Sequence, residues 1–119
     1  MARQVLLVAA YDSQLKWVMT LADEFADQGW RYTVVVPTDV RHSLSSDQIA
    51  AAANGVGIER LRWAELLRRS RLADCVVLAL QGTLVARFTD ELELLRRESP
   101  SDHEPVVVTG WVGIIIEKL

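Results

Sequence analysis

An uninterrupted apolar run, Val5-Leu6-Leu7-Val8-Ala9-Ala10, ends abruptly at the polar stretch Tyr11-Asp12-Ser13. A strand with one face in water alternates apolar and polar residues, and this run does not alternate. Continuous apolar runs are typical of strands in a parallel sheet, because crossover helices cover both faces of such a sheet. The stretch therefore predicts a buried parallel strand that ends in a polar loop.

Further apolar runs of the same kind recur along the chain. They lie at residues 32–36, 76–80 and 106–108, and a weaker strand is expected at Ile58–Leu61. The first three of these runs are rich in Val, which suits the pleated surface of a sheet. Together with the opening run, they predict five strands.

The segments between these strands have the periodicity of amphipathic helices. Asp12 or Ser13 is expected to cap the first helix, and Gly29 to end it in a left-handed conformation. Further helices are expected at residues 45–54, 63–69 and 84–95. The apolar stripe of the first helix consists of Leu15, Val18, Met19, Ala22, Phe25 and Ala26.

The resulting order of elements is βαβαβαβαβ. Because crossovers between parallel strands are right-handed, few arrangements are compatible with this order. The commonest is a three-layer, doubly wound α/β fold of Rossmann-like type, with about five parallel strands in the order 3-2-1-4-5. Ligands bind to such folds at the carboxyl ends of the strands, where the strand order reverses. The loops after the first and fourth strands are therefore the leading candidates for a site.

Size and composition narrow the class of protein. A chain of 119 residues supports one core, so we expect residues 1–119 to form a single domain. The net charge of −3 does not favour nucleic acid as a partner. The single cysteine, Cys75, lies in an apolar run, which excludes an internal disulfide and fits a reducing cytoplasm. No run has the length of a transmembrane segment or the features of a signal peptide, so a soluble, cytoplasmic protein is predicted.

The end of the chain suggests a larger protein. Residues 114–119 begin an apolar element that stops with the chain, and a natural domain rarely ends in this way. We therefore expect the chain to be the N-terminal half of a longer two-domain protein. A short C-terminal helix or edge strand that completes a small independent domain is the alternative.

The loop after the first strand carries the candidate residues Tyr11, Asp12, Ser13 and Lys16. Ser13, Gln14 and the first-turn amides can bind an anion or a hydroxyl at the helix N-terminus, and Lys16 can neutralise an anion there. Asp12 can serve as a general base toward a hydroxyl. Simple helix capping is the alternative interpretation. The chain lacks the GxGxxG and GxxxxGK[ST] spacings, which argues against the common dinucleotide and P-loop sites.

Two further loops carry the remaining candidates. After the fourth strand, Gln81-Gly82-Thr83 offers an amide side chain, a glycine that permits close backbone approach, and a threonine that can cap a helix. After the fifth strand, Gly110, Trp111 and Gly113 belong to a loop suited to stacking on a ring. The alternatives are an ordinary strand-to-helix turn in the first case and packing of Trp111 under the following chain in the second.

Several other sites are not favoured. No metal site is expected, because His42 and His103 lie in separate polar loops without a second ligand nearby. The arginines between Arg60 and Arg71 are interleaved with acidic residues and are interpreted as a solvated face. A phosphoacceptor receiver domain needs several acidic residues and a lysine at its strand ends, and only Asp12 is placed near such a position. A flavodoxin-type site needs a Ser/Thr-rich first loop, which this chain lacks.

Three stretches carry a resemblance to a known family. They are Val5-Leu6-Leu7-Val8-Ala9-Ala10-Tyr11-Asp12-Ser13 followed by Lys16-Trp17, the strand entry Ala73-Asp74-Cys75-Val76-Val77, and Pro105-Val106-Val107-Val108-Thr109-Gly110-Trp111-Val112-Gly113. In these stretches, and diffusely over its whole length, the chain resembles the N-terminal Rossmann-like domain of actinobacterial glycosyltransferases of the two-domain GT-B type. The resemblance implies a role in capsular or cell-envelope polysaccharide synthesis. A glycine-rich first loop, which many GT-B proteins have, is missing here.

The resemblance implies a division of labour between two domains. This domain would contact a small-molecule or glycan acceptor, with Asp12 or Ser13, Gln81-Gly82 and residues 110–113 near it. The protein's own C-terminal domain would bind most of the nucleotide-sugar donor, so the isolated chain would be inactive. The donor is a substrate, and no cofactor is implied. A nucleotide-sugar epimerase of the same architecture and a non-catalytic flavodoxin-like binding or regulatory module are the alternatives, and peripheral membrane contact and the oligomeric state stay open.

Overall fold

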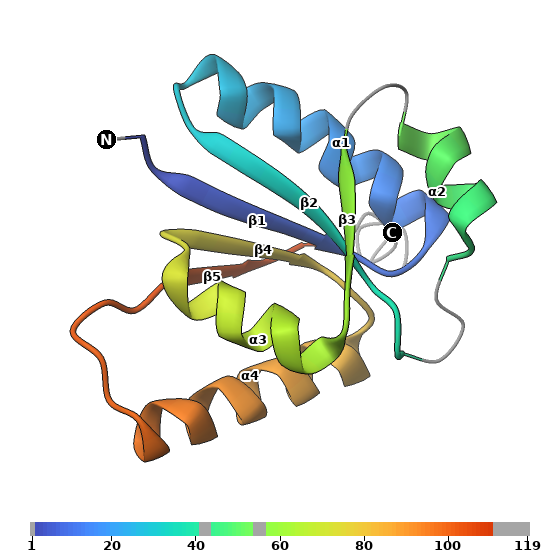
Figure 1. Ribbon diagram of the computed structural model, residues 1–119. Helices are drawn as coiled ribbons and strands as arrows, with labels where there is room; N and C mark the ends of the chain where they lie inside the picture. The colour runs from blue at the N-terminus through green and yellow to red at the C-terminus, as the bar shows by residue number, and fades with distance from the viewer. Residues whose placement is uncertain (1, 41–43, 54–56, 111–119) are drawn as a thin grey trace, which may run out of the picture.

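The computed structural model describes residues 2–40, 44–53 and 57–110, and Figure 1 shows their arrangement. Five strands alternate with four helices in this part of the chain, in the predicted order. The elements are β1 (Gln4–Ala9), α1 (Asp12–Asp27), β2 (Arg31–Pro37), α2 (Ser46–Ala53), β3 (Ile58–Leu61), α3 (Trp63–Leu72), β4 (Cys75–Ala79), α4 (Gly82–Glu98) and β5 (Val106–Thr109).

The five strands form one parallel sheet in the order β3-β2-β1-β4-β5, which confirms the predicted topology. β1 lies at the centre, where Val5 is paired with Tyr32 of β2 on one side and with Cys75 of β4 on the other. The strand order reverses between β1 and β4. All strands end at the same edge of the sheet, which we call the carboxyl edge, and begin at the opposite amino edge.

Each face of the sheet has its own hydrophobic core, because successive residues of a strand point to opposite faces. Leu6 and Val8 of β1 pack in the core beneath α3 and α4. Val5 and Leu7 pack in the core beneath α1 and α2. Figure 1 shows these two pairs of helices on opposite faces of the sheet. Burial on both faces explains why β1 and β4 are continuously apolar. The same expectation is wrong for β5, because this strand lies at the edge of the sheet and its Val106 and Val108 are 64% and 44% exposed.

The first helix ends as predicted. Gly29 has a φ of +84°, a left-handed conformation that side chains with a Cβ rarely adopt. The amide of Gly29 donates to the carbonyl of Ala26, and the amide of Trp30 donates to that of Phe25. The rings of Phe25 and Trp30 pack edge to face at 5.2 Å. These bonds and this contact form a Schellman motif, which turns the chain directly into β2.

The second helix begins at the predicted serine. The amide of Gln48 donates to Ser45 Oγ at 3.2 Å, and Gln48 Oε1 accepts from the amide of Ser45 at 2.9 Å. This reciprocal pair is a capping box, which satisfies two amides that the helix leaves without partners. The predicted helix end at Asn54-Gly55 lies outside the described residues.

The third helix extends beyond the predicted end at residue 69, to Leu72. Ser70 is fully buried, and its hydroxyl donates to the carbonyl of Leu66 one turn earlier, at 2.7 Å. The serine therefore satisfies its own polar group within the helix while its small side chain packs against the core. The helix can therefore continue through Ser70, beyond the charged residues Arg68 and Arg69.

Candidate functional site

The two predicted loops meet at the carboxyl edge. Ala9 of β1 is paired with Ala79 of β4, so the loops that follow these strands leave the sheet side by side. The hydroxyl of Tyr11 donates to Gln81 Oε1 at 3.4 Å, an exposed contact between residues 70 positions apart. The structure therefore brings the first and fourth loops together at the point where the strand order reverses.

A buried glutamine holds the first loop in shape. Gln14 is 2% exposed, and its Oε1 accepts from the amides of Ala10 at 3.2 Å and Tyr11 at 3.1 Å. The prediction that Asp12 or Ser13 caps α1 is wrong. Tyr11 occupies the N-cap position and its side chain makes no capping bond, because Gln14, three residues on, reaches back to the N-cap amide instead. The expectation that Gln14 receives a ligand is also wrong, because its side chain is buried and bonded to the loop. A glutamine three residues after a helix start is the signal that sequence reasoning missed.

Apart from Gln14, the polar side chains at the start of α1 face solvent. Asp12 and Ser13 are exposed, and the Asp12 carboxylate lies 3.1 Å from Lys16 Nζ. The two side chains of this pair are 54% and 68% exposed, so the ion pair adds little to stability. A carboxylate, a hydroxyl and an ammonium group are therefore accessible together beside the Tyr11–Gln81 contact.

The fourth loop leads directly into α4. Gln81 is the N-cap residue and Gly82 the first residue of the helix, and both are exposed. Thr83 does not cap α4, because it lies within the first turn and no side chain makes a capping bond. A Cβ placed on Gly82 would have no heavy atom within 4 Å, so the backbone is open to an approaching group. The first turn of α4 has no acidic residue, and its N-terminus favours an anion.

Gly110, the first residue after β5, lies against α1. The amide of Gly110 donates to the carbonyl of Leu78 at 3.2 Å, which keeps Gly110 beside β4. A Cβ at position 110 would lie 2.4 Å from Cη2 of Trp17, so only glycine fits here without a shift. The structure thus brings Gly110 to the α1 side of the carboxyl edge. The other two predicted residues of this loop, Trp111 and Gly113, lie outside the described residues.

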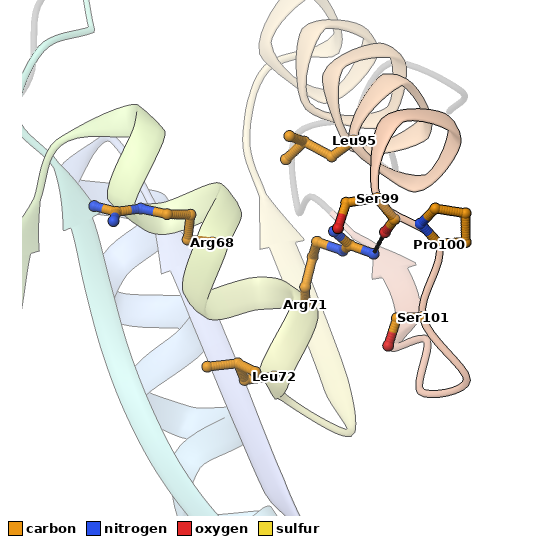
Figure 2. A pocket seen from close by; sticks show the side chains of 7 residues that line it. All are labelled: Arg68, Arg71, Leu72, Leu95, Ser99, Pro100 and Ser101. Carbon is orange, nitrogen blue, oxygen red and sulfur yellow. Dashed lines mark hydrogen bonds between the residues drawn. The ribbon is translucent and has the colours of Figure 1, made fainter.

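A hollow of about 400 Å³ lies at the opposite, amino edge and contains none of the predicted site residues. Figure 2 shows Arg71 reaching across it from α3 toward the end of α4, where Nη2 donates to the carbonyl of Ser99 at 2.5 Å. Glu104 lies 3.9 Å from the same nitrogen. The lining residues are Arg68, Arg71, Leu72, Leu95, Ser99, Pro100 and Ser101.

Arg71 departs from the predicted solvated face, because its side chain is only 16% exposed. Its Nε is fully buried and has no hydrogen-bond partner among the described residues, so a ligand in the hollow cannot reach it unless the side chain moves. The accessible part of the guanidinium is already paired with the chain's own oxygens. We therefore place the candidate site at the carboxyl edge, where this fold binds ligands.

Other chemistry-bearing residues have structural surroundings. Cys75 is buried in the sheet, and burial raises the pKa of its thiol, which makes it a poor nucleophile. His103 Nε2 lies 2.8 Å from the carbonyl of Ala73, which ties the loop after α4 to the start of β4. Within residues 2–40, 44–53 and 57–110, no group of three or more potential metal ligands occurs. His42 lies outside this part of the chain.

Comparison with known proteins gives one match. A family model described as "Putative glycosyltransferase (DUF6716)" matches residues 5–119. Neither the curated proteins nor the solved structures contain a match to the chain. Among the helices that the structure describes, none has the length and apolar character needed to cross a membrane.

Proposed function

The chain belongs to the family described as "Putative glycosyltransferase (DUF6716)", and we propose that it is the N-terminal, acceptor-side domain of a two-domain GT-B glycosyltransferase. The parallel sheet in the order β3-β2-β1-β4-β5 supports this proposal, because it is the arrangement of one Rossmann-like unit. The resemblance of the sequence further favours an actinobacterial enzyme of capsular or cell-envelope polysaccharide synthesis.

The observation that carries the proposal is the contact between Tyr11 and Gln81. It joins the two loops that flank the switch point of the sheet, and it lies beside the exposed carboxylate of Asp12 and the open backbone of Gly82. A hydroxyl-bearing acceptor at this edge would meet a base, hydrogen-bonding groups and a helix N-terminus within one small region.

In the proposed reaction, an acceptor hydroxyl attacks the anomeric carbon of a nucleotide sugar. A new bond forms between the acceptor oxygen and this carbon, while the bond from the carbon to the diphosphate oxygen breaks and its electron pair leaves with the nucleoside diphosphate. Asp12 takes the proton of the acceptor hydroxyl. Ser13 and Gln81 position the acceptor through hydrogen bonds.

The charge that develops on the leaving diphosphate needs stabilisation. The N-termini of α1 and α4 point to the carboxyl edge, and Lys16 adds a positive charge there. We assign most of the donor contacts to a second Rossmann-like domain that follows this chain. A reading frame that continues with a second series of alternating strands and helices would support this assignment, whereas one that ends at Leu119 would exclude it.

The test is an assay of the full-length protein with a panel of nucleotide sugars, in which release of nucleoside diphosphate and transfer of the sugar are both measured. Asp12→Asn should reduce the transfer rate by about 100-fold or more, since general-base catalysis contributes about 10²–10⁴-fold. The matched control is Asp23→Asn, an exposed aspartate on the same helix, which should not change the rate.

Two results would contradict the proposal. Activity that does not depend on a nucleotide sugar would exclude a glycosyltransferase of this kind. A product in which the sugar changes configuration but stays joined to its nucleotide would identify an epimerase instead.

A further inference from the structure

Trp17 differs from the other two tryptophans in the described part of the chain. Trp63 is buried, and its Nε1 donates to the carboxylate of Glu91. Trp30 packs against Phe25 in the Schellman motif. Trp17 is half-buried, and its Nε1 donates to no residue that the structure describes. Hydrogen bonding therefore accounts for the indole N–H of Trp63, whereas Trp17 and Trp30 are both half-buried and no bond from either indole to a described residue is seen.

The indole of Trp17 lies on the α1 side of the carboxyl edge. Its benzo ring contacts Gly110, where a Cβ would lie 2.4 Å from Cη2 and 3.2 Å from Cζ2. Side chains of a helix lean toward its N-terminus, so an indole on the second turn of α1 leans toward the first loop. Ser13 lies four residues earlier and therefore on the same face of the helix. The indole thus contacts Gly110 and belongs to the helix face that also carries Ser13.

From this position we infer that Trp17 binds the acceptor, and that the acceptor is a sugar ring. The inference rests on the proposed function and names the substrate class of the same site. An indole has an apolar face that matches the C–H face of a pyranose, and an N–H that can donate to one of its hydroxyls. A linear alcohol has no ring face to stack, so it gains much less from this side chain.

A purely structural role predicts different behaviour. If Trp17 only fills the space above Gly110, replacement should lower stability and impair all substrates alike. Trp17→Leu keeps an apolar side chain but removes the aromatic face and the donor. Trp17→Phe keeps an aromatic face and removes only the donor, so it should rescue part of any loss that stacking explains.

The experiment uses the full-length protein and three readouts. These are hydrolysis of the nucleotide sugar without acceptor, KM for the nucleotide sugar, and KM for acceptors. The acceptor probes are the methyl pyranosides of glucose, galactose and mannose, and glycerol serves as a hydroxyl-bearing probe without a ring. Trp30→Leu is the matched control, since Trp30 lies at the other end of α1.

For Trp17→Leu we expect KM for the pyranosides to rise about tenfold, with donor hydrolysis, donor KM and glycerol KM unchanged. Trp17→Phe should lie between Leu and the wild type. Equal effects on pyranosides and glycerol, unchanged pyranoside KM, or failure of the wild type to use any pyranoside while it hydrolyses the donor would overturn the inference. If the wild type turns over no nucleotide sugar at all, the proposed function itself fails.

A second variant tests the inference even if the Trp17 variants fail to fold. Gly110→Ala places a methyl group against the benzo ring and should displace it, so pyranoside KM should rise again. In the Trp17→Leu background, the same change should add nothing to pyranoside KM. An independent, additive effect of the two substitutions would contradict the inference.

Discussion

The polar groups around Asp74, at the amino edge of the sheet, form more hydrogen bonds within the protein than those of the first and fourth loops at the carboxyl edge. At the amino edge, the Asp74 carboxylate accepts from the amide of Gln4 at 2.8 Å, and the Asp74 backbone bonds to both Gln4 and Val106. Arg71 is paired with Ser99 in the same region. At the carboxyl edge, the first and fourth loops share one exposed side-chain contact of 3.4 Å among the described residues.

This difference indicates that the amino edge contributes to stability and that the carboxyl edge is suited to binding a ligand. The amino edge joins the starts of β1, β4 and β5 through bonds that are satisfied within the protein. The carboxyl edge keeps a carboxylate, a hydroxyl, an amide and an open glycine exposed, where a ligand can reach them. A hollow at the amino edge is therefore weaker evidence for a site than exposed polar groups at the switch point.

The substitution with the largest expected effect on stability lies at the carboxyl edge, so this edge also contains groups that stabilise the fold. Gln14→Leu removes the acceptor for the amides of Ala10 and Tyr11 at the carboxyl edge. Since a buried amide without a partner costs about 1–3 kcal/mol, the free energy of unfolding should fall by about 2–4 kcal/mol. Urea denaturation measures this, with Gln28→Leu as an exposed control that should change it by less than about 0.5 kcal/mol. A loss below about 1 kcal/mol would show that water replaces the side chain.

A smaller loss is expected at the amino edge. Asp74→Ala removes the bond to the amide of Gln4, and the free energy of unfolding should fall by about 1–2 kcal/mol. Asp102→Ala is the matched control, because Asp102 is exposed on the neighbouring loop. Transfer activity should be unchanged in both variants once the proteins are folded. Equal stability of the two would mean that the Asp74 carboxylate does not tie this edge together.

The smallest effect on stability should accompany a clear effect on activity. Gly82→Ala meets no atom within 4 Å, and alanine suits a helix better than glycine, so unfolding should change by less than about 0.5 kcal/mol. Transfer should nevertheless fall about tenfold, because the methyl group occupies the space that a ligand needs to approach the backbone. Gly57→Ala, equally free of contacts but at the amino edge, should alter neither property. Unchanged kcat/KM in Gly82→Ala would remove this residue from the site.

Much of the candidate site can be predicted from the amino-acid sequence. Strand ends are marked by a change from apolar to polar residues, and the topology follows from the alternation of strands with helices, so the loops at Tyr11 and Gln81 can be paired from pattern alone. The role of Gln14 cannot be predicted in this way, because in the sequence it is simply one polar residue on a helix. The contact between Trp17 and Gly110 cannot either, because it joins residues far apart in sequence.

The burial of Arg71 likewise could not be predicted from the sequence. Arg71 lies in the same arginine-rich helix as the exposed Arg68, and nothing local distinguishes the two residues. It is buried because α3 and the end of α4 enclose it, which depends on how two helices pack. Whether a side chain on the surface of a helix is buried depends on the elements packed around it. The periodicity of the helix itself contains no information about those elements.

Local pattern was sufficient for the parallel sheet, its strand order and the position of the switch point, because burial on both faces leaves an unbroken apolar run in the central strands β1 and β4. The same holds for the helix end at Gly29 and the helix start at Ser45, where the chemistry lies within a few residues. Packing in three dimensions was needed for the buried role of Gln14, the indole of Trp17 against Gly110 and the enclosure of Arg71. These depend on which distant atoms come within contact distance, and no spacing along a chain contains that information.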